Sequence, residues 1–235
     1  MDRTRGQAIL ITGATGGIGQ AMAEALHAAG ASVALTGRHA HRLTELAARL
    51  GDVPAIAADL TDEAQAAAAV GEAREKLGRL DTLINLAGMS IPGPIAEMSV
   101  DDYAAVMNAN VRSAFLANKH FLKCVDPEAG GLIVSVSSVA GHQANGTAPV
   151  YCAAKAALNM MHQGLALQVK QANVRVSLVS PGAVASPFWG DRQVPHDKFM
   201  TPDEVAEVIA FVVNLPSSVV LDDVVFRPWA LVRGG

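Results

Sequence analysis

A tyrosine and a lysine four residues apart, in the segment Tyr151 to Lys155 (YCAAK), have the types and spacing needed for proton transfer. On a helix this spacing places both side chains on one face. A free tyrosine has a pKa of about 10 and is a poor base at neutral pH, whereas a nearby ammonium group favours the phenolate and lowers that pKa. We expect Tyr151 to transfer a proton with help from Lys155, although such a pair also occurs on the surface of many non-catalytic helices.

Hydroxyl groups follow a buried apolar run upstream of this pair. The run Leu132 to Val134 is typical of a strand covered on both faces, and Ser137 and Ser138 follow shortly after it. Doubly wound proteins bind ligands at the carboxyl ends of their parallel strands. We expect Ser138 to reach a substrate oxygen and Ser137 to make the local hydrogen bond that is usual after a strand. His142, slightly further on, either lines the substrate pocket or lies in a solvated loop.

A glycine-rich turn, Thr12 to Gly19 (TGATGGIG), connects a short apolar run to a segment of helical period. Glycines let the backbone approach a pyrophosphate, whose charge is then stabilised by the positive N-terminal end of the following helix. A plain turn between a strand and a helix is the alternative. The residues that we expect around a dinucleotide phosphate are Gly13, Thr15, Gly17, Ile18 and Gly19.

The end of the second apolar run indicates which dinucleotide is bound. An Asp or Glu there would pair with the ribose hydroxyls of NAD and repel a 2′-phosphate. The sequence has no acid in Leu35 to Arg38 (LTGR), and Arg38 and Arg42 could hold a 2′-phosphate. We expect NADP(H), with NAD(H) as the alternative if both arginines are merely solvated. Asp59 and Leu60 end the third run, where Asp59 could bind the adenine amino group, cap the next helix, or do both.

Runs rich in Val, Ile and Leu alternate with longer segments of helical period, which is the pattern of strand and helix units in a parallel sheet. Predicted strands lie at 7–12, 31–36, 53–57, 81–86, 130–136, 174–180 and 222–226. Predicted helices lie at 18–29, 39–50, 62–78, 100–124, 150–172 and 203–214. We expect an α/β fold with a doubly wound, seven-stranded parallel sheet of the Rossmann type, in a single domain over residues 1–235. The segment 186–201 breaks every period and is expected to be a substrate loop.

Composition argues against several function classes. The net charge of -4 provides no basic excess for a nucleic-acid partner. Two cysteines, Cys124 and Cys152, cannot form a dense disulfide framework, and no apolar stretch approaches the roughly 18 residues needed to span a bilayer. His39 and His41 lack the cysteines or carboxylates of a metal cluster. We expect a soluble, cytoplasmic protein without a metal, nucleic-acid or membrane partner.

Taken in order, these motifs resemble the short-chain dehydrogenase/reductase family along nearly the whole chain. The glycine turn is similar to the family's TGxxxGxG, and Ser138, Tyr151 and Lys155 match its catalytic serine and YxxxK motif. The resemblance implies that Asn110 holds a water linking Lys155 to solvent and that Lys155 also binds the nicotinamide ribose. It further implies the following cofactor-binding residues, with Ser186 where relatives often have Thr: Asn85, Ala87, Gly88, Tyr151, Lys155, Pro181, Gly182, Val184 and Ser186.

The resemblance implies hydride transfer between NADP(H) and a substrate carbon, with Ser138 binding the substrate oxygen and Tyr151 transferring the proton. We expect reduction of a ketone or 3-oxo group. The alternatives are an NAD-dependent alcohol dehydrogenase and a dinucleotide-binding sensor or scaffold without turnover. Relatives that prefer NADP(H) often have a basic residue where this chain has Gly16, so the selectivity is left to Arg38 and Arg42. In the family the helix after Lys155 commonly packs against its copy, which predicts a homodimer or homotetramer.

Overall fold

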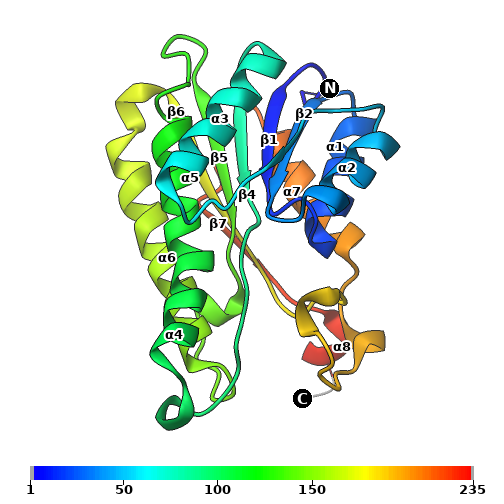
Figure 1. Ribbon diagram of the computed structural model, residues 1–235, viewed down its shortest axis with the longest axis vertical. Coiled ribbons are helices and arrows are strands. Elements are labelled where there is room, and N and C mark those ends of the chain that lie inside the picture. Colours follow the sequence, from blue (N-terminus) through cyan, green and yellow to red (C-terminus); the bar gives the residue numbers. More distant parts are fainter. Residues whose placement is uncertain (1–2, 234–235) are drawn as a thin grey trace.

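Seven parallel strands form one sheet in the order β3-β2-β1-β4-β5-β6-β7 in the computed structural model, which describes residues 3–233 (Figure 1). The strands are β1 (Ala8–Thr12), β2 (Ser32–Gly37), β3 (Ala55–Ala57), β4 (Thr82–Asn85), β5 (Gly131–Val136), β6 (Val174–Pro181) and β7 (Asp223–Phe226). Each matches a predicted strand, which confirms the predicted sheet. Because β1 pairs with both β2 and β4, the winding direction reverses beside it. Ligands of such sheets bind at the carboxyl edge next to that reversal.

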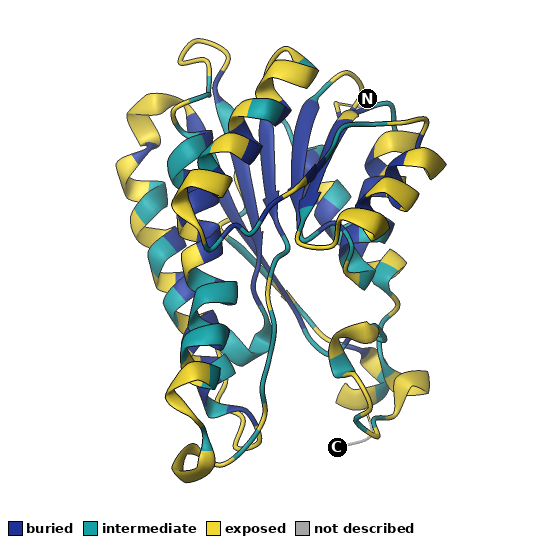
Figure 2. Cartoon of the chain, viewed as in Figure 1, coloured by how far each residue is buried: buried dark blue, intermediate teal, exposed yellow. Residues whose placement is uncertain are grey.

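Helices cover both faces of the sheet. α1 (Gly17–Ala28), α2 (Ala40–Arg49) and α7 (Pro202–Val213) pack on one face, and α3 (Glu63–Leu77), α5 (Ser113–Phe121) and α6 (Pro149–Gln168) pack on the other. Within β1, Ile9 and Ile11 join the core of the first face, whereas Leu10 joins the core of the second. Every residue of β1 is buried, as its continuous apolar run predicts, and Figure 2 shows the strands enclosed by helices whose outer surfaces are exposed.

The single helix predicted at 100–124 is interrupted. It consists of α4 (Val100–Met107), a π-helical turn, η2 (Asn108–Arg112), and α5. Within this turn, the buried Asn110 donates from Nδ2 to the carbonyl oxygens of Val106, at 2.8 Å, and Met89, at 2.7 Å. π-helical turns are rare and frequently occur at functional sites. The prediction missed the interruption because the segments on both sides of it keep a helical period.

The predicted loop at 186–201 contains two short 3-10 helices, η5 (Pro187–Trp189) and η6 (His196–Lys198). A bridge between Val184 and Met200 joins its two ends. The loop leads into a capping box that starts α7: Glu204 N donates to the Thr201 hydroxyl at 3.2 Å, and Thr201 N donates to the Glu204 carboxylate at 2.7 Å. The segment thus has fixed ends beside the carboxyl edge of the sheet.

The remaining short elements are η1 (Ile95–Glu97), η3 (Val139–Gly141), η4 (Lys170–Ala172) and α8 (Trp229–Val232). η3 directly follows Ser138 and is part of the site described below. α8 follows β7 and was not predicted from the sequence. Within residues 3–233, no helix combines the length and the apolar character needed to cross a membrane.

Candidate active site

A cavity of about 550 Å³ runs along the carboxyl edge of the sheet. The segments that follow β1 to β6, together with α6, form its walls. Of the residues predicted for the site, all but one line this cavity: Gly13, Thr15, Gly17, Ile18, Gly19, Arg38, Arg42, Asp59, Leu60, Ala87, Gly88, Asn110, Ser138, Tyr151, Lys155, Pro181, Gly182, Val184 and Ser186. Asn85 is the exception. The fold therefore brings together motifs that lie far apart in the sequence.

The glycine turn forms a cradle that side chains would fill. A Cβ atom at Gly13 would lie 2.7 Å from the backbone nitrogen of Ala87, and one at Gly17 would lie 2.8 Å from Cβ of Ser186. A Cβ at Gly19 would overlap the carbonyl oxygen of Gly13. Gly13 also has a φ of +64°, which favours glycine. Because α1 begins at Gly17, its free N–H groups lie at this cradle, which suits a pyrophosphate.

Two exposed arginines lie at the other end of this region. Arg38 follows β2, Arg42 lies in the first turn of α2, and both line the cavity. Within residues 3–233 neither has a carboxylate partner in an ion pair. The β2 residue next to them is Gly37, so no acidic side chain occupies the position that would select NAD. The guanidinium groups therefore remain available for an anion.

Asp59 uses its carboxylate locally. It accepts hydrogen bonds from the backbone N of Thr61 at 2.9 Å and from the Thr61 hydroxyl at 2.7 Å. The backbone hydrogen bond is the main cause that lowers the pKa of Asp59, and the nearby charge of Arg38 acts in the same direction. The helix cap itself is Asp62, whose carboxylate accepts from Gln65 N at 2.9 Å. Asp59 thus stabilises the turn ahead of α3 rather than capping that helix.

The proposed proton-transfer residues lie together at the opposite end of the cavity. Tyr151 is hydrogen-bonded to Ser138, and burial, only partly offset by that hydrogen bond, raises the pKa of Tyr151 to about 12. Lys155 is 4% exposed and donates from Nζ to the Val136 carbonyl at 2.9 Å. Burial lowers the pKa of Lys155 to about 8.

The electrostatic outcome differs from the sequence-based expectation. Lys155 Nζ lies 5.8 Å from the centre of the Tyr151 ring, on the same helix face as predicted. However, the effect of burial on the Tyr151 pKa outweighs every effect that lowers it. The phenol is consequently in its protonated form at neutral pH in this structure.

Asn110 lies beside Lys155 and retains an unused acceptor. Its Oδ1 atom is buried and has no hydrogen-bond partner among residues 3–233. A Cβ atom at Gly88 would lie 2.6 Å from this oxygen and 3.4 Å from Lys155 Nζ. The absence of a side chain at Gly88 therefore keeps the space around both polar groups open, which is compatible with the water-holding role inferred for Asn110.

Asn85 does not line the cavity, contrary to its predicted place at the cofactor. Its side chain is 5% exposed and donates from Nδ2 to Asn118 Oδ1 at 2.8 Å and to Ser135 Oγ at 3.0 Å. Ser135 Oγ in turn lies 2.6 Å from Nε2 of the buried His162. This polar network joins β4, β5, α5 and α6 inside the protein, so its members act as supports. The family resemblance included Asn85 because it belongs to a matching motif. A sequence motif does not show in which direction each of its side chains is oriented.

The substrate end of the cavity has an aromatic wall from the loop at 186–201. The Phe188 ring centre lies 5.6 Å from that of Tyr151, and Phe188 and Trp189 pack edge to face. Arg192 lies over both rings, at 5.4 Å and 4.9 Å from their centres, and donates from Nε to the Trp189 carbonyl at 2.7 Å. Polar groups of Ser90, Asn145 and Thr147 line the same cavity. Arg192 was not singled out from the sequence, where its only signal was a cation within an aromatic-rich loop.

His142 does not line the cavity, and its partly buried side chain contacts Ser180 and Asp223 instead of solvent alone. Within residues 3–233, no three His, Cys, Asp or Glu side chains cluster in a way that could hold a metal ion.

Comparison with known proteins is consistent with this geometry. A model of the short chain dehydrogenase family matches residues 7–195. An oxidoreductase of Staphylococcus saprophyticus, described as uncharacterized, is 32% identical over 224 residues, which cover 93% of this chain and 96% of that protein.

Solved structures are similar over almost the whole chain. A short chain dehydrogenase from Burkholderia cenocepacia, in complex with NADP, has a TM-score of 0.89 and 30% identity and covers 97% of this chain and 99% of its own. An alcohol dehydrogenase from the archaeon Thermococcus sibiricus, complexed with 5-hydroxy-NADP, has a TM-score of 0.89 and 25% identity, with coverage of 95% and 97%.

Proposed function

The chain belongs to the short-chain dehydrogenase/reductase family and is an oxidoreductase, and from this premise we propose that it reduces a ketone or 3-oxo group to a secondary alcohol with NADPH. The observation that carries the proposal is the convergence of Ser138, Tyr151 and Lys155 at one end of a cavity whose other end holds Arg38 and Arg42. One domain over residues 1–235 would supply both ends.

In this proposal the protein residues bind the substrate oxygen and deliver a proton. Bound NADPH supplies the hydride. Ser138 and Tyr151 donate hydrogen bonds to the substrate carbonyl oxygen, where negative charge develops during reduction. Tyr151 then transfers its phenolic proton to that oxygen. Lys155 Nζ, held by the Val136 carbonyl 5.8 Å from the centre of the Tyr151 ring, would stabilise the phenolate that remains, and Asn110 Oδ1 is available to a water on the path to solvent.

The protonation state of Tyr151 supports the direction of the reaction. A pKa of about 12 keeps the phenol protonated at neutral pH, and reduction requires a proton donor. Oxidation of an alcohol would need the phenolate as a base. Reduction is therefore the proposed direction, and oxidation is expected to require higher pH.

NADP(H) is proposed over NAD(H) because Arg38 and Arg42 line the cavity without a carboxylate partner in the described part of the chain, and the neighbouring β2 residue is Gly37 instead of an acid. Arginine pairs well with phosphate because its planar group donates two parallel hydrogen bonds. The Burkholderia and Thermococcus proteins were solved with NADP and a hydroxylated NADP, which adds support.

The surroundings of the site support further parts of the proposal. Family membership implies a small-molecule substrate, and Phe188 and Trp189 favour an apolar group next to its carbonyl. The exposed apolar side chains of Phe115 on α5 and Met160 on α6 suit a contact with a second copy, as in the predicted homodimer or homotetramer. Both cysteines have free thiols, which fits a reducing cytoplasm.

Cofactor titration tests the proposal. NADPH and NADH are titrated against the wild type, Arg38→Ala and the control Arg74→Ala, while nicotinamide fluorescence is followed. Arg74 is an exposed arginine on α3 that does not line the cavity. We expect the wild type to bind NADPH more tightly than NADH. Arg38→Ala should lose about tenfold or more in NADPH affinity, whereas Arg74→Ala should bind NADPH like the wild type.

The other outcomes separate the alternative functions. Equal or tighter binding of NADH would favour the NAD-dependent alcohol dehydrogenase. Binding of either cofactor without turnover of any ketone or 3-oxoacyl compound would favour the sensor or scaffold.

A further inference from the structure

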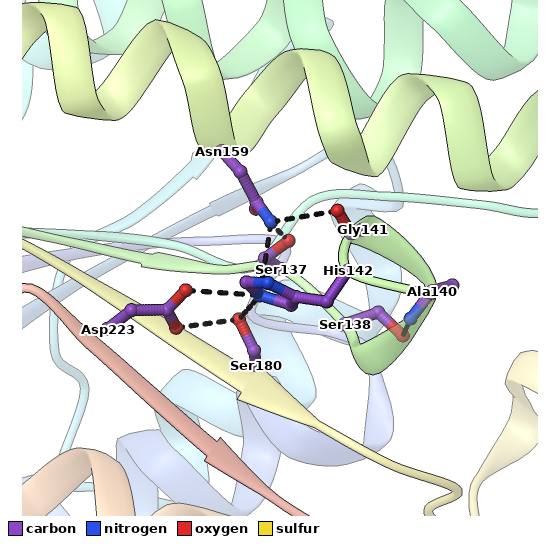
Figure 3. A network of polar contacts seen from close by, with 8 residues as sticks. All are labelled: Ser137, Ser138, Ala140, Gly141, His142, Asn159, Ser180 and Asp223. Carbon is purple, nitrogen blue, oxygen red and sulfur yellow. Dashed lines mark hydrogen bonds and ion pairs between the residues drawn. The ribbon is translucent and has the colours of Figure 1, made fainter. Parts of the chain in front are cut away.

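His142 belongs to a polar network behind the catalytic serine, shown in Figure 3. Its Nε2 atom lies 3.0 Å from Asp223 Oδ2 and 3.1 Å from Ser180 Oγ. The Ser180 hydroxyl donates to the other oxygen of Asp223 at 2.9 Å. The three residues come from the segment after η3, from β6 and from β7, so the contacts join parts of the chain that are up to 81 residues apart.

The partners determine which nitrogen carries a proton. The Asp223 carboxylate only accepts, and the single hydroxyl hydrogen of Ser180 is already donated to it. His142 Nε2 must therefore carry a hydrogen and donate toward Asp223 and Ser180. With a hydrogen on Nε2, the Asn159 amide Nδ2 that lies 3.1 Å away cannot donate to it, and it donates to the Gly141 carbonyl at 3.3 Å. The imidazole is thus oriented by a carboxylate, as in other histidine and carboxylate pairs.

The network holds the segment that carries Ser138. This serine starts η3, with its Oγ accepting from Ala140 N at 3.1 Å, and Gly141 N donates to the Ser138 carbonyl at 2.9 Å. Gly141 packs so closely on α6 that a Cβ atom there would lie 2.7 Å from Asn159 Nδ2. Helix α6 therefore supports one side of η3. His142, which ends η3, supports the other side by reaching β6 and β7.

The same contacts reach the segment proposed to bind the nicotinamide. Ser180 directly precedes Pro181 and Gly182, which line the cavity, and Gly182 N donates to the Phe226 carbonyl on β7 at 2.8 Å. His142 and Asp223 themselves do not line the cavity. Together, His142 and Asp223 connect the segment of Ser138, which is proposed to bind the substrate oxygen, with the segment of Pro181 and Gly182, which is proposed to bind the nicotinamide.

We propose that His142 and Asp223 are positioning residues that fix the Ser138 segment relative to Pro181 and Gly182, so that the substrate carbonyl and the nicotinamide meet at reacting distance. This inference rests on the proposed function. The pair acts through Ser138 and Ser180 and does not touch the substrate. The two side chains are 32% and 23% exposed, and the proposed effect of their contact is on the geometry of the site. A misplacement of about 1 Å in a catalytic group costs up to about 100-fold in rate.

The experiment compares His142→Ala, Asp223→Ala, the double variant and His142→Gln with His41→Ala. The control removes a histidine that faces a carboxylate on an exposed helix surface, Glu45 at 3.4 Å. We expect kcat for carbonyl reduction to fall by about 10- to 100-fold in His142→Ala and Asp223→Ala, with KM and the NADPH dissociation constant within about twofold of wild type. The double variant should be no slower than either single variant, because one link is lost in each.

Rescue and exchange distinguish positioning from simple destabilisation. His142→Gln keeps an N–H that can reach Asp223 and should recover most of the lost kcat, which a general loss of stability would not predict. Hydrogen exchange of the Gly141 and His142 amides, which donate to the carbonyls of Ser138 and Val139, should speed up in His142→Ala and not in His41→Ala.

An unchanged kcat in His142→Ala would overturn the inference. So would a fall in kcat that is accompanied by an equal fall in NADPH affinity and that His142→Gln does not rescue. If the wild type bound NADPH but reduced no carbonyl compound, the proposed function would fail separately. In that event the exchange data alone would decide: faster exchange would support the link between η3 and β7, and unchanged exchange would refute it.

Discussion

The buried histidine of α6, His162, predicts a specific loss of stability in acid. It is 1% exposed, and burial is the main cause that lowers its pKa to about 4 from 6.5. Its Nδ1 donates to the Leu158 carbonyl at 3.0 Å, because that oxygen can only accept. Nε2 is then left to accept from the Ser135 hydroxyl at 2.6 Å. A second proton would have to enter Nε2, where burial and the charge of Lys155 both oppose it.

The size of the effect follows from the two pKa values. In the unfolded chain His162 binds a proton below about pH 6.5, whereas in the folded protein it stays neutral down to about pH 4. The free energy of unfolding therefore falls as the pH is lowered through this window. Between pH 7 and pH 4.5 this one residue should remove about 2.5 kcal/mol, a large part of the stability of an ordinary domain.

Urea unfolding followed by circular dichroism, at pH 7 and at pH 4.5 and at one protein concentration, measures this loss. The wild type is compared with His162→Gln, which keeps an acceptor for Ser135 but cannot take up the proton, and with His41→Gln on the exposed surface of α2. Other titrating groups, such as His120 and Asp59, are present in all three proteins and cancel in the difference. His162→Gln should lose about 2.5 kcal/mol less than either comparison protein between the two pH values. Equal losses in all three would refute the reasoning.

Other predictions concern the site itself. Tyr151→Phe should lower kcat by about 100-fold or more and leave the NADPH dissociation constant within about twofold, and unchanged turnover would contradict the proposed proton donor. With the wild type, carbonyl reduction should be nearly independent of pH between 6 and 7, below the Lys155 pKa of about 8, whereas alcohol oxidation should rise by about tenfold per pH unit over the same range; a falling oxidation rate would contradict it. Gly19→Ala should weaken NADPH binding by at least about tenfold in fluorescence titrations, because its Cβ would overlap Gly13, while Gly71→Ala, whose Cβ meets nothing within 4 Å, should bind normally.

The sequence was most informative where function needs a fixed backbone or a fixed spacing. The run Ala8 to Ile11 must be a buried strand, and the glycines after it must form a tight turn, because other residues would not fit there. Tyr151 and Lys155 share a helix face for reasons of helix geometry alone. These local rules were sufficient to predict all seven strands and the cavity that they form at the carboxyl edge.

Local rules of this kind cannot predict contacts between segments that are distant in the sequence. Nothing in the sequence joins His142 to Asp223, because their contact depends on the pairing of β6 with β7. The inward direction of Asn85 depends in the same way on Ser135 of the neighbouring strand. The expected lowering of the Tyr151 pKa by Lys155 was also wrong: burial raises that pKa, and Lys155 is not among the groups that shift it, because the prediction considered charge and omitted the burial of both groups. Pairwise reasoning of this kind cannot include a desolvation that the whole fold creates.

Helix α6 shows how the fold holds the proposed catalytic residues in place. Four of its side chains, spaced by four, four and three residues along one face, contact groups at the end of β5 and directly after it. These contacts are, in order along the helix, Tyr151 with Ser138, Lys155 with the Val136 carbonyl, Asn159 with Ser137, and His162 with Ser135. An apolar face could slide along a strand at small cost, whereas buried hydrogen bonds are directional and costly to leave unmade. The two polar residues beyond Lys155 therefore fix the position of α6 on β5, and the chemistry at Tyr151 depends on groups up to three turns away from it.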